Sequence, residues 1–274
     1  MIVSLIEVNI EEIMGPHPVV PHPCGISFTA LDAKTMNNLP HRKLHHDPQM
    51  GNELIDAMTK WIVSHHMSTE NIDRDRRRRE ALARQGLQDP TQRLPQNTST
   101  QKGNWAEILL AEYVAASCNT QIPIYRLRYN TNVDQSMKGD DVLAFDLDSN
   151  PARVIVGEAK FRSTSTTQVV GELIDALEKS HLGNIPASLQ FVADRLFDSG
   201  SEELGEKVAG CNILFAQNRL QLDYVGLLVS NGKAHDHVYS KAKSDAPRLA
   251  IMSLAFSDPG SIVATCFANA ARML

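Results

Sequence analysis

Two apolar segments joined by a short turn place the strongest constraint on how this chain folds. The first, DVLAFDLD, covers residues 141–148, and the second, RVIVGEAKF, covers residues 153–161. Runs of this length, rich in valine, isoleucine and leucine, are typical of buried strands. The connecting DSNPA contains the proline, asparagine and serine that favour a turn. The pattern therefore predicts an antiparallel hairpin inside a sheet.

The charged residues of this hairpin are expected to gather at one end. Asp141 opens the first strand, and Glu158 and Lys160 stand near the end of the second. Because side chains alternate along a strand, Glu158 and Lys160 project to one side and Ala159 to the other. The start of the first strand lies beside the end of the second in an antiparallel pair, so Asp141 is expected next to Glu158.

Two adjacent carboxylates repel one another unless a cation offsets their charge. Mg²⁺ or Mn²⁺ suits this role, since Mg²⁺ in proteins is held by one or two carboxylates and retains several waters. Asp141 and Glu158 would bind the ion, and the backbone carbonyl of Ala159 would add a further oxygen. Lys160 would orient the attacking water or stabilise charge on a phosphate. The alternative is a surface ion pair that contributes little. We favour the functional interpretation because these charges terminate strands that are otherwise buried.

The remaining pattern predicts an α/β fold, a mixed sheet flanked by helices. Helices are expected at residues 104–117, 166–181 and 261–273, with further helical material at 187–217. Besides the hairpin, strands are expected in three more places in the same half: IPIYRLRY (122–129), LDYVGLLVS (222–230) and RLAIMSLAF (248–256).

The N-terminal region, residues 1–90, is expected to pack on this core or to contact a partner, and the core itself to span residues 100–274. The region contains strand-like segments at 1–10 and 26–33 and an amphipathic helix at 51–67. A polar, proline-bearing linker follows at 86–102.

An arginine run, Arg74 and Arg76 to Arg79, stands at the end of the N-terminal region and has two interpretations. Spacing of four residues pairs Asp73 with Arg77, Asp75 with Arg79 and Arg76 with Glu80, as in a solvated helix. The alternative is a contact with DNA or with a partner protein.

Composition limits the classes of function. The chain of 274 residues has 42% hydrophobic residues and no apolar run of about 20 residues, so we expect a soluble, cytoplasmic protein without a membrane partner. The net charge of −5 counts against strong binding of nucleic acid by this chain alone. Four scattered cysteines predict free thiols, and the histidines lack the spacing of a zinc site and are expected in loops and on the surface.

The stretch KGDDVLAFDLD followed by GEAKFR resembles the PD-(D/E)xK nuclease superfamily. This resemblance implies a restriction-endonuclease-like core in which Asp141, Glu158 and Lys160 form the active site. Members often carry a glutamate on the first core helix and a glutamine on the helix after the motif. These positions correspond to Glu107 and Gln168, which the resemblance assigns to the active site, Glu107 as a metal ligand.

Each of these two residues also has a structural interpretation. Glu107 lies in the apolar helix KGNWAEILLAEYVAAS, where an unpaired carboxylate is costly, so an ion pair with Arg126 or Arg128 is the alternative. Gln168 stands three residues after Ser165, the spacing of a capping box.

Three neighbours of the motif are assigned less specific roles. Asp140 and Asp146 are expected to be solvated. Arg162 shares the face of Glu158 and is expected to contact either a phosphate or an acidic side chain.

The segments KGNWAEILLAEYV, KGDDVLAFDLD and GEAKFR together resemble the nuclease subunit of the Hachiman anti-phage defence system, over residues 102–274. That family implies a DNase that acts on DNA in complex with a helicase subunit. Two alternatives remain open: a stand-alone restriction endonuclease of the same fold, and a non-catalytic module that regulates a helicase. The sequence leaves the oligomeric state open.

Overall fold

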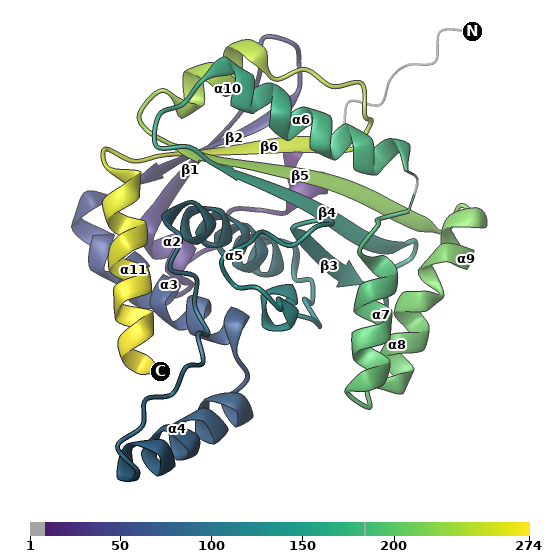
Figure 1. Cartoon of the computed structure of the whole chain (residues 1–274). Coiled ribbons are helices and arrows are strands. Elements are labelled where there is room, and N and C mark those ends of the chain that lie inside the picture. The colour runs from purple at the N-terminus through teal and green to yellow at the C-terminus, as the bar shows by residue number, and fades with distance from the viewer. Residues whose placement is uncertain (1–8, 184) are drawn as a thin grey trace, which may run out of the picture.

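The computed structural model describes residues 9–183 and 185–274, and its centre is one six-stranded mixed sheet (Figure 1). The strands follow the order β1-β2-β6-β5-β4-β3 across the sheet. Their bounds are β1 Phe28–Lys34, β2 Pro40–His46, β3 Val142–Asp146, β4 Ala152–Phe161, β5 Leu220–Ser230 and β6 Leu249–Ala255. The two outer pairs are antiparallel, whereas β2, β6, β5 and β4 run parallel. The predicted mixed sheet is confirmed.

The hairpin predicted from the two apolar segments is present at one edge of the sheet. β3 and β4 are antiparallel, with Val142 opposite Gly157 and Asp146 opposite Arg153. β4 continues beyond the start of β3, and its residues up to Phe161 pair with β5 on the other side. The residues just before β3 therefore lie against the free edge of the last part of β4.

Helices cover both faces of the sheet (Figure 1). One face packs against α1 (Ile10–Met14), α2 (Pro23–Ser27), α3 (Gly51–His66), α5 (Thr98–Cys118) and α11 (Pro259–Met273). The other packs against α6 (Thr167–Leu182), α7 (Leu189–Asp198), α8 (Glu202–Ala209), α9 (Cys211–Ala216) and α10 (Ala234–Lys241). Two short 3₁₀ turns, η1 (Pro48–Met50) and η2 (Arg126–Tyr129), lie in connections. None of the described helices has the length and apolar character needed to cross a membrane.

Helix α5 is buried on nearly all sides, as its composition predicts. Asn97 caps its start, accepting hydrogen bonds from the backbone of Ser99 and Thr100, and the left-handed Asn119 ends it. Trp105, Ile108 and their apolar neighbours are buried between the sheet, α3 and α11. The middle of the helix, which includes Glu107, is therefore enclosed by the core.

The prediction of a strand at residues 122–129 is wrong. Gln121, just before this segment, forms an isolated bridge with Phe145, and residues 122–125 then continue as an irregular loop into η2. Pro123 has no N–H for a ladder. Arg126 is instead held inward, because its guanidinium donates to the backbone carbonyls of Asp140 and Met137.

The N-terminal region contributes two strands to the same sheet. β2 pairs in parallel with β6, and β1 extends the sheet beyond it. The predicted strand at 26–33 and the predicted helix at 51–67 are confirmed as β1 and α3. The strand predicted at 1–10 falls almost wholly outside the described residues. A division of the chain near residue 90 stays a prediction.

The arginine run lies on α4 (Thr69–Arg84), which projects from the body of the molecule (Figure 1). The three predicted four-residue pairs do not form. Arg76 pairs with Asp73, and Arg78 pairs with the buried Asp75, each three residues away. Arg93 also binds Asp75 at 2.6 Å (Nε to Oδ2), so tertiary contact decides the pairing on this helix.

The cysteines are free, as predicted, but several histidines lie in the interior instead of in loops and on the surface. His41, His65 and His66 are buried. His41 shares the hydroxyl of Ser253 with His235, at 2.6 and 2.7 Å. These rings pack inside the fold because neighbouring polar groups bind at least one nitrogen of each, and both nitrogens of His66.

Candidate active site

The carboxylate of Asp141 is fixed at the free edge of β4. Its Oδ2 accepts a hydrogen bond from the backbone N–H of Ala159 at 2.9 Å. This amide is available because β3 begins only at Val142, which lies opposite Gly157, so no residue of β3 faces Ala159. Asp141 therefore replaces the missing backbone partner, and its side chain is held beside Glu158, as the sequence predicts.

Glu158 and Lys160 are joined by an ion pair on the same side of β4. Lys160 Nζ lies 2.5 Å from Glu158 Oε1. Val154 and Val156, which share this face, belong to the core beneath α6, whereas Ala159 belongs to the core beneath α5. The ammonium thus neutralises one carboxylate oxygen of the hairpin end.

Glu107 approaches from α5, on the opposite face of the sheet. Its side chain is buried, 8% exposed as a residue. Gly157 permits the close packing of α5 on β4, because a Cβ there would lie 2.9 Å from the side chain of Leu110 and 2.8 Å from that of Val142. Glu107 lies one turn before Leu110, so this packing brings the Glu107 side chain towards the start of β3, where Asp141 lies.

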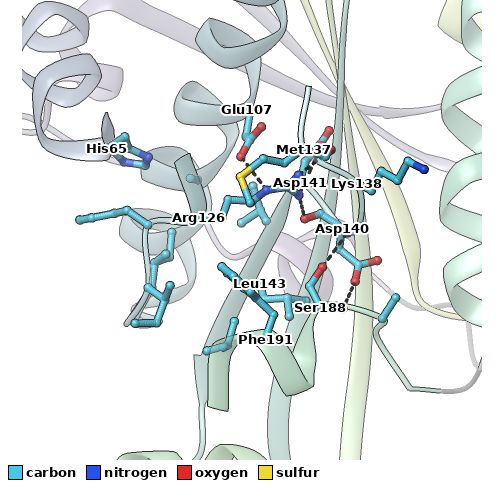
Figure 2. A pocket seen from close by; sticks show the side chains of 18 residues that line it. His65, Glu107, Arg126, Met137, Lys138, Asp140, Asp141, Leu143, Ser188 and Phe191 are labelled. Atoms are coloured by element: carbon cyan, nitrogen blue, oxygen red, sulfur yellow. Dashed lines mark hydrogen bonds and ion pairs between the residues drawn. The ribbon is translucent and has the colours of Figure 1, made fainter. Parts of the chain in front are cut away.

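Arg126 lies between Glu107 and Asp141 (Figure 2). Its Nε is 3.4 Å from Glu107 Oε1, and its Nη1 is 3.8 Å from Asp141 Oδ1. The ion pair that the sequence offered as the alternative for Glu107 is present. Arg128 takes no part in it and instead donates to the carbonyl of Ser64.

The pKa values of all three carboxyl groups are raised. Burial, together with the charges of Asp141 and Glu158, raises the pKa of Glu107 to about 8 against the opposing effect of Arg126. Burial is also the largest cause of the raised pKa of Asp141. The pKa of Glu158 is raised first by burial and then by Asp141, with Lys160 opposing both. The three carboxyl groups are therefore close enough to interact, and the positive charge beside them is too small to offset their combined negative charge.

The donor set suits a small, hard cation. Among the described residues no hydrogen bond is made to Asp141 Oδ1 or to Glu158 Oε2, and Asp141 Oδ1 has only the guanidinium of Arg126 nearby, at 3.8 Å. Within the described part of the chain, no three His, Cys, Asp and Glu side chains are already grouped to hold a metal ion. Two carboxylates and a backbone carbonyl such as that of Ala159 still match the way Mg²⁺ is held, because most of its ligands are waters.

Gln168 is placed at the exposed start of α6. Its Nε2 donates to Glu172 at 3.0 Å, and Glu172 also pairs with Arg162 at 2.9 Å. The predicted capping box is wrong, because Thr166 is the N-cap and Ser165 bonds His237 instead. An active-site role of Gln168 stays a prediction.

Asp140 was expected to be solvated, and this is wrong: it is 6% exposed. Its carboxylate accepts hydrogen bonds from the Ser180 hydroxyl at 2.8 Å and the Ser188 backbone at 3.0 Å, and its own N–H donates to the Ser188 hydroxyl. Gly139 precedes it with φ of 111°, and a Cβ there would lie 2.5 Å from that hydroxyl. The repeated acid in GDD was the only sequence signal for this anchor.

A pocket of about 330 Å³ adjoins the acidic residues (Figure 2). Glu107, Arg126 and Asp141 form one end, and Leu143 and Phe191 lie at the other. Glu158 and Lys160 are not among its lining residues. The pocket therefore opens beside the hairpin end and is separate from the Glu158 to Lys160 pair.

Comparisons with known proteins agree with the resemblance to a subunit of the Hachiman system. A family model described as HamA matches residues 27–270. A protein of Bacillus cereus described as "Hachiman protein HamA" is 35% identical over 260 residues, which cover 94% of this chain and 93% of the relative. Both matches include the hairpin and all the acidic residues above. The chain therefore belongs to the HamA family.

Proposed function

We propose that the protein is a metal-dependent deoxyribonuclease that serves as an effector in an anti-phage defence complex. One observation carries the proposal: Asp141 is held by the amide of Ala159, directly beside the Glu158 and Lys160 pair. This arrangement corresponds to that expected of a PD-(D/E)xK site. The raised pKa values of Asp141 and Glu158 support it, since such shifts concentrate where a cation or a reaction requires them.

Each side chain has a defined task in this proposal. Asp141 and Glu158 bind Mg²⁺ or Mn²⁺ through their free oxygens, with the carbonyl of Ala159, and Glu107 completes the site directly or through water. The bound ion would polarise the phosphate and activate a water. Lys160, once released from Glu158, orients that water and stabilises charge on the phosphate oxygens.

The defence setting and the partner rest on family membership. The relative's name places it in a Hachiman system, and we infer the same setting here, with a helicase subunit that delivers DNA. The net charge of −5 supports this division of labour, because a nuclease that met DNA alone would be expected to carry more positive charge.

The test is a cleavage assay with the full-length chain, alone and with its helicase partner, in Mg²⁺ and in EDTA. Glu158→Gln and Lys160→Ala should abolish Mg²⁺-dependent cleavage. Glu172→Gln is the matched control, since Glu172 is an exposed carboxylate on α6 that pairs with Arg162. If both site variants cut DNA like the wild type, the proposal is wrong.

The same assay separates the two alternatives. A stand-alone restriction endonuclease would cut intact DNA at a fixed sequence without the helicase or ATP. A non-catalytic module would give no cleavage and no calorimetric signal with Mn²⁺.

A further inference from the structure

The pocket beside the acidic residues has an apolar wall and a charged end. Its wall is formed mainly by side chains from the loop before η2, from β3 and from α7, namely Ile122, Ile124, Leu143, Phe191 and Val192. Glu107, Asp141 and Arg126 form the charged end. A volume of about 330 Å³ is within the range of small-molecule sites. Its occupant must therefore combine a flat or compact apolar part with a charged part.

A nucleotide has this combination, and the position of the pocket favours a nucleotide as its occupant. Asp141 belongs both to the pocket and to the proposed metal site, so a phosphate bound at Asp141 would bring its own base to the pocket mouth. Phe191 is partly exposed there, and Arg195 lies over its ring, 5.7 Å from the centroid. Aromatic side chains of this kind bind bases by stacking, with little preference for sequence.

We propose that this pocket binds the nucleobase of an unpaired nucleotide next to the phosphodiester bond that is cut. The inference rests on the proposed nuclease function and narrows its substrate. A base inside a duplex is stacked and paired, so it must leave the stack to enter the pocket, and this costs the energy of unstacking and unpairing. The proposed nuclease is therefore expected to prefer single strands, frayed ends and gaps over intact duplex as its substrates.

The walls of the pocket are fixed before any ligand arrives. Tyr125 is packed against His65, with ring centroids 4.1 Å apart, and Arg128 lies 4.7 Å from the centre of its ring. Ser188, on the opposite wall, is hydrogen-bonded to Asp140. A preformed site loses little entropy on binding, which suits a base better than a flexible protein segment. An apolar side chain of the helicase partner is the rival occupant.

The experiment measures binding without cleavage, in EDTA and at low salt, with the full-length chain and with its helicase complex in parallel. The probe is a single-stranded oligonucleotide that carries the fluorescent base 2-aminopurine. We expect its fluorescence to be quenched on binding. Phe191→Leu keeps an apolar side chain and removes the ring, and it should weaken binding about fivefold or more. Phe197→Leu on the same helix is the matched control, because Phe197 lies outside the pocket.

Two further ligands identify the source of the base. An abasic oligonucleotide of equal length should bind wild type and Phe191→Leu equally. Free 2-aminopurine deoxyribonucleoside monophosphate distinguishes a chain base from a soluble nucleotide: quenching of the free nucleotide alone would assign the pocket a soluble ligand and overturn the inference. If neither probe is quenched by the chain or by its complex, the inference is overturned. It is also overturned if Phe191→Leu leaves oligonucleotide binding unchanged and weakens only the helicase complex.

The inference and the proposed function fail in different ways. Loss of Mg²⁺-dependent cleavage from the wild type, with quenching retained, would remove the nuclease and leave the base site. Cleavage that is normal in Phe191→Leu on single strands and on duplex alike would leave the nuclease and remove the base site.

Discussion

Arg126 provides the positive charge closest to Glu107, with 3.4 Å between Nε and Oε1. The same guanidinium lies 3.8 Å from Asp141 Oδ1, and it also donates to the carbonyls of Asp140 and Met137. One arginine thus offsets the charge of two carboxylates that the proposed function assigns to a metal ion. A divalent cation bound there has to share these oxygens with Arg126 or displace it.

This competition makes a prediction for Arg126→Gln. Without the guanidinium, the affinity for Mn²⁺ measured by calorimetry should rise severalfold at low salt. The metal-free protein should lose about 3 kcal/mol of unfolding free energy, because buried carboxylates are left unpaired. Arg128→Gln is the control, since Arg128 contacts neither carboxylate. Weaker Mn²⁺ binding in Arg126→Gln would mean that the arginine assists the ion.

Asp141 can be tested by a change of one atom. Asp141→Asn keeps an oxygen to accept the hydrogen bond from Ala159, so the fold should be retained. The charge is lost, and we expect DNA cleavage to fall about a hundredfold or more and the Mn²⁺ signal to disappear. Asp146→Asn, at the other end of β3, should leave both DNA cleavage and the Mn²⁺ signal unchanged. Equal losses in the two variants would indicate that the hairpin and not the site had been damaged.

The hairpin and its acidic end could be predicted because the signals are local. Alternation along β4 places Glu158 with Lys160, and the DSNPA turn fixes the register that brings Asp141 to the amide of Ala159. The wider sheet followed from apolar runs of strand length. These features need only neighbours in the sequence or one short turn.

The sequence offered Arg126 as a partner of Glu107, but the backbone acceptors that hold Arg126 and the anchoring of Asp140 could not be predicted because those partners are distant in the sequence. Asp140 meets Ser180 and Ser188, which are 40 and 48 residues away. Residues 122–129 alternate like a strand, but tertiary acceptors hold Arg126 out of any ladder. Contacts of this kind leave no periodic pattern in the sequence.

The anchoring role predicts that Asp140 affects stability first. Asp140→Ala leaves the Ser180 hydroxyl and the Ser188 N–H without their acceptor, and we expect a loss of about 2–3 kcal/mol in urea unfolding. Asp140→Asn retains one acceptor oxygen and should lose less. Mn²⁺ affinity should fall in proportion to stability, because the loop that carries Asp141 loosens. A large loss of Mn²⁺ binding with unchanged stability would instead assign Asp140 to the metal.

The buried histidines predict acid sensitivity. Burial, aided by Lys43, lowers the pKa of His41 to about 3, and burial with the nearby His45 and Lys43 lowers that of His235 to about 4. An unfolded histidine has a pKa of about 6.5. Between these values the unfolded chain binds protons that the folded protein does not, so stability falls as the pH falls from about 6.5 towards 4.

His41→Gln should therefore reduce this dependence. Its side-chain amide can still meet the Ser253 hydroxyl, which His41 contacts at 2.6 Å, while the titrating group is removed. Melting temperatures measured from pH 7 to pH 5 should fall less steeply in this variant than in the wild type. His181→Gln is the control and should follow the wild type, because the His181 ring packs on Tyr224 and is not among the groups that shift the pKa of His41 or His235. If the curves of the wild type and His41→Gln are parallel, the acid-sensitive group lies elsewhere. A protein that buries a neutral His41 must lose stability as the pH falls through this range, and the variant must not.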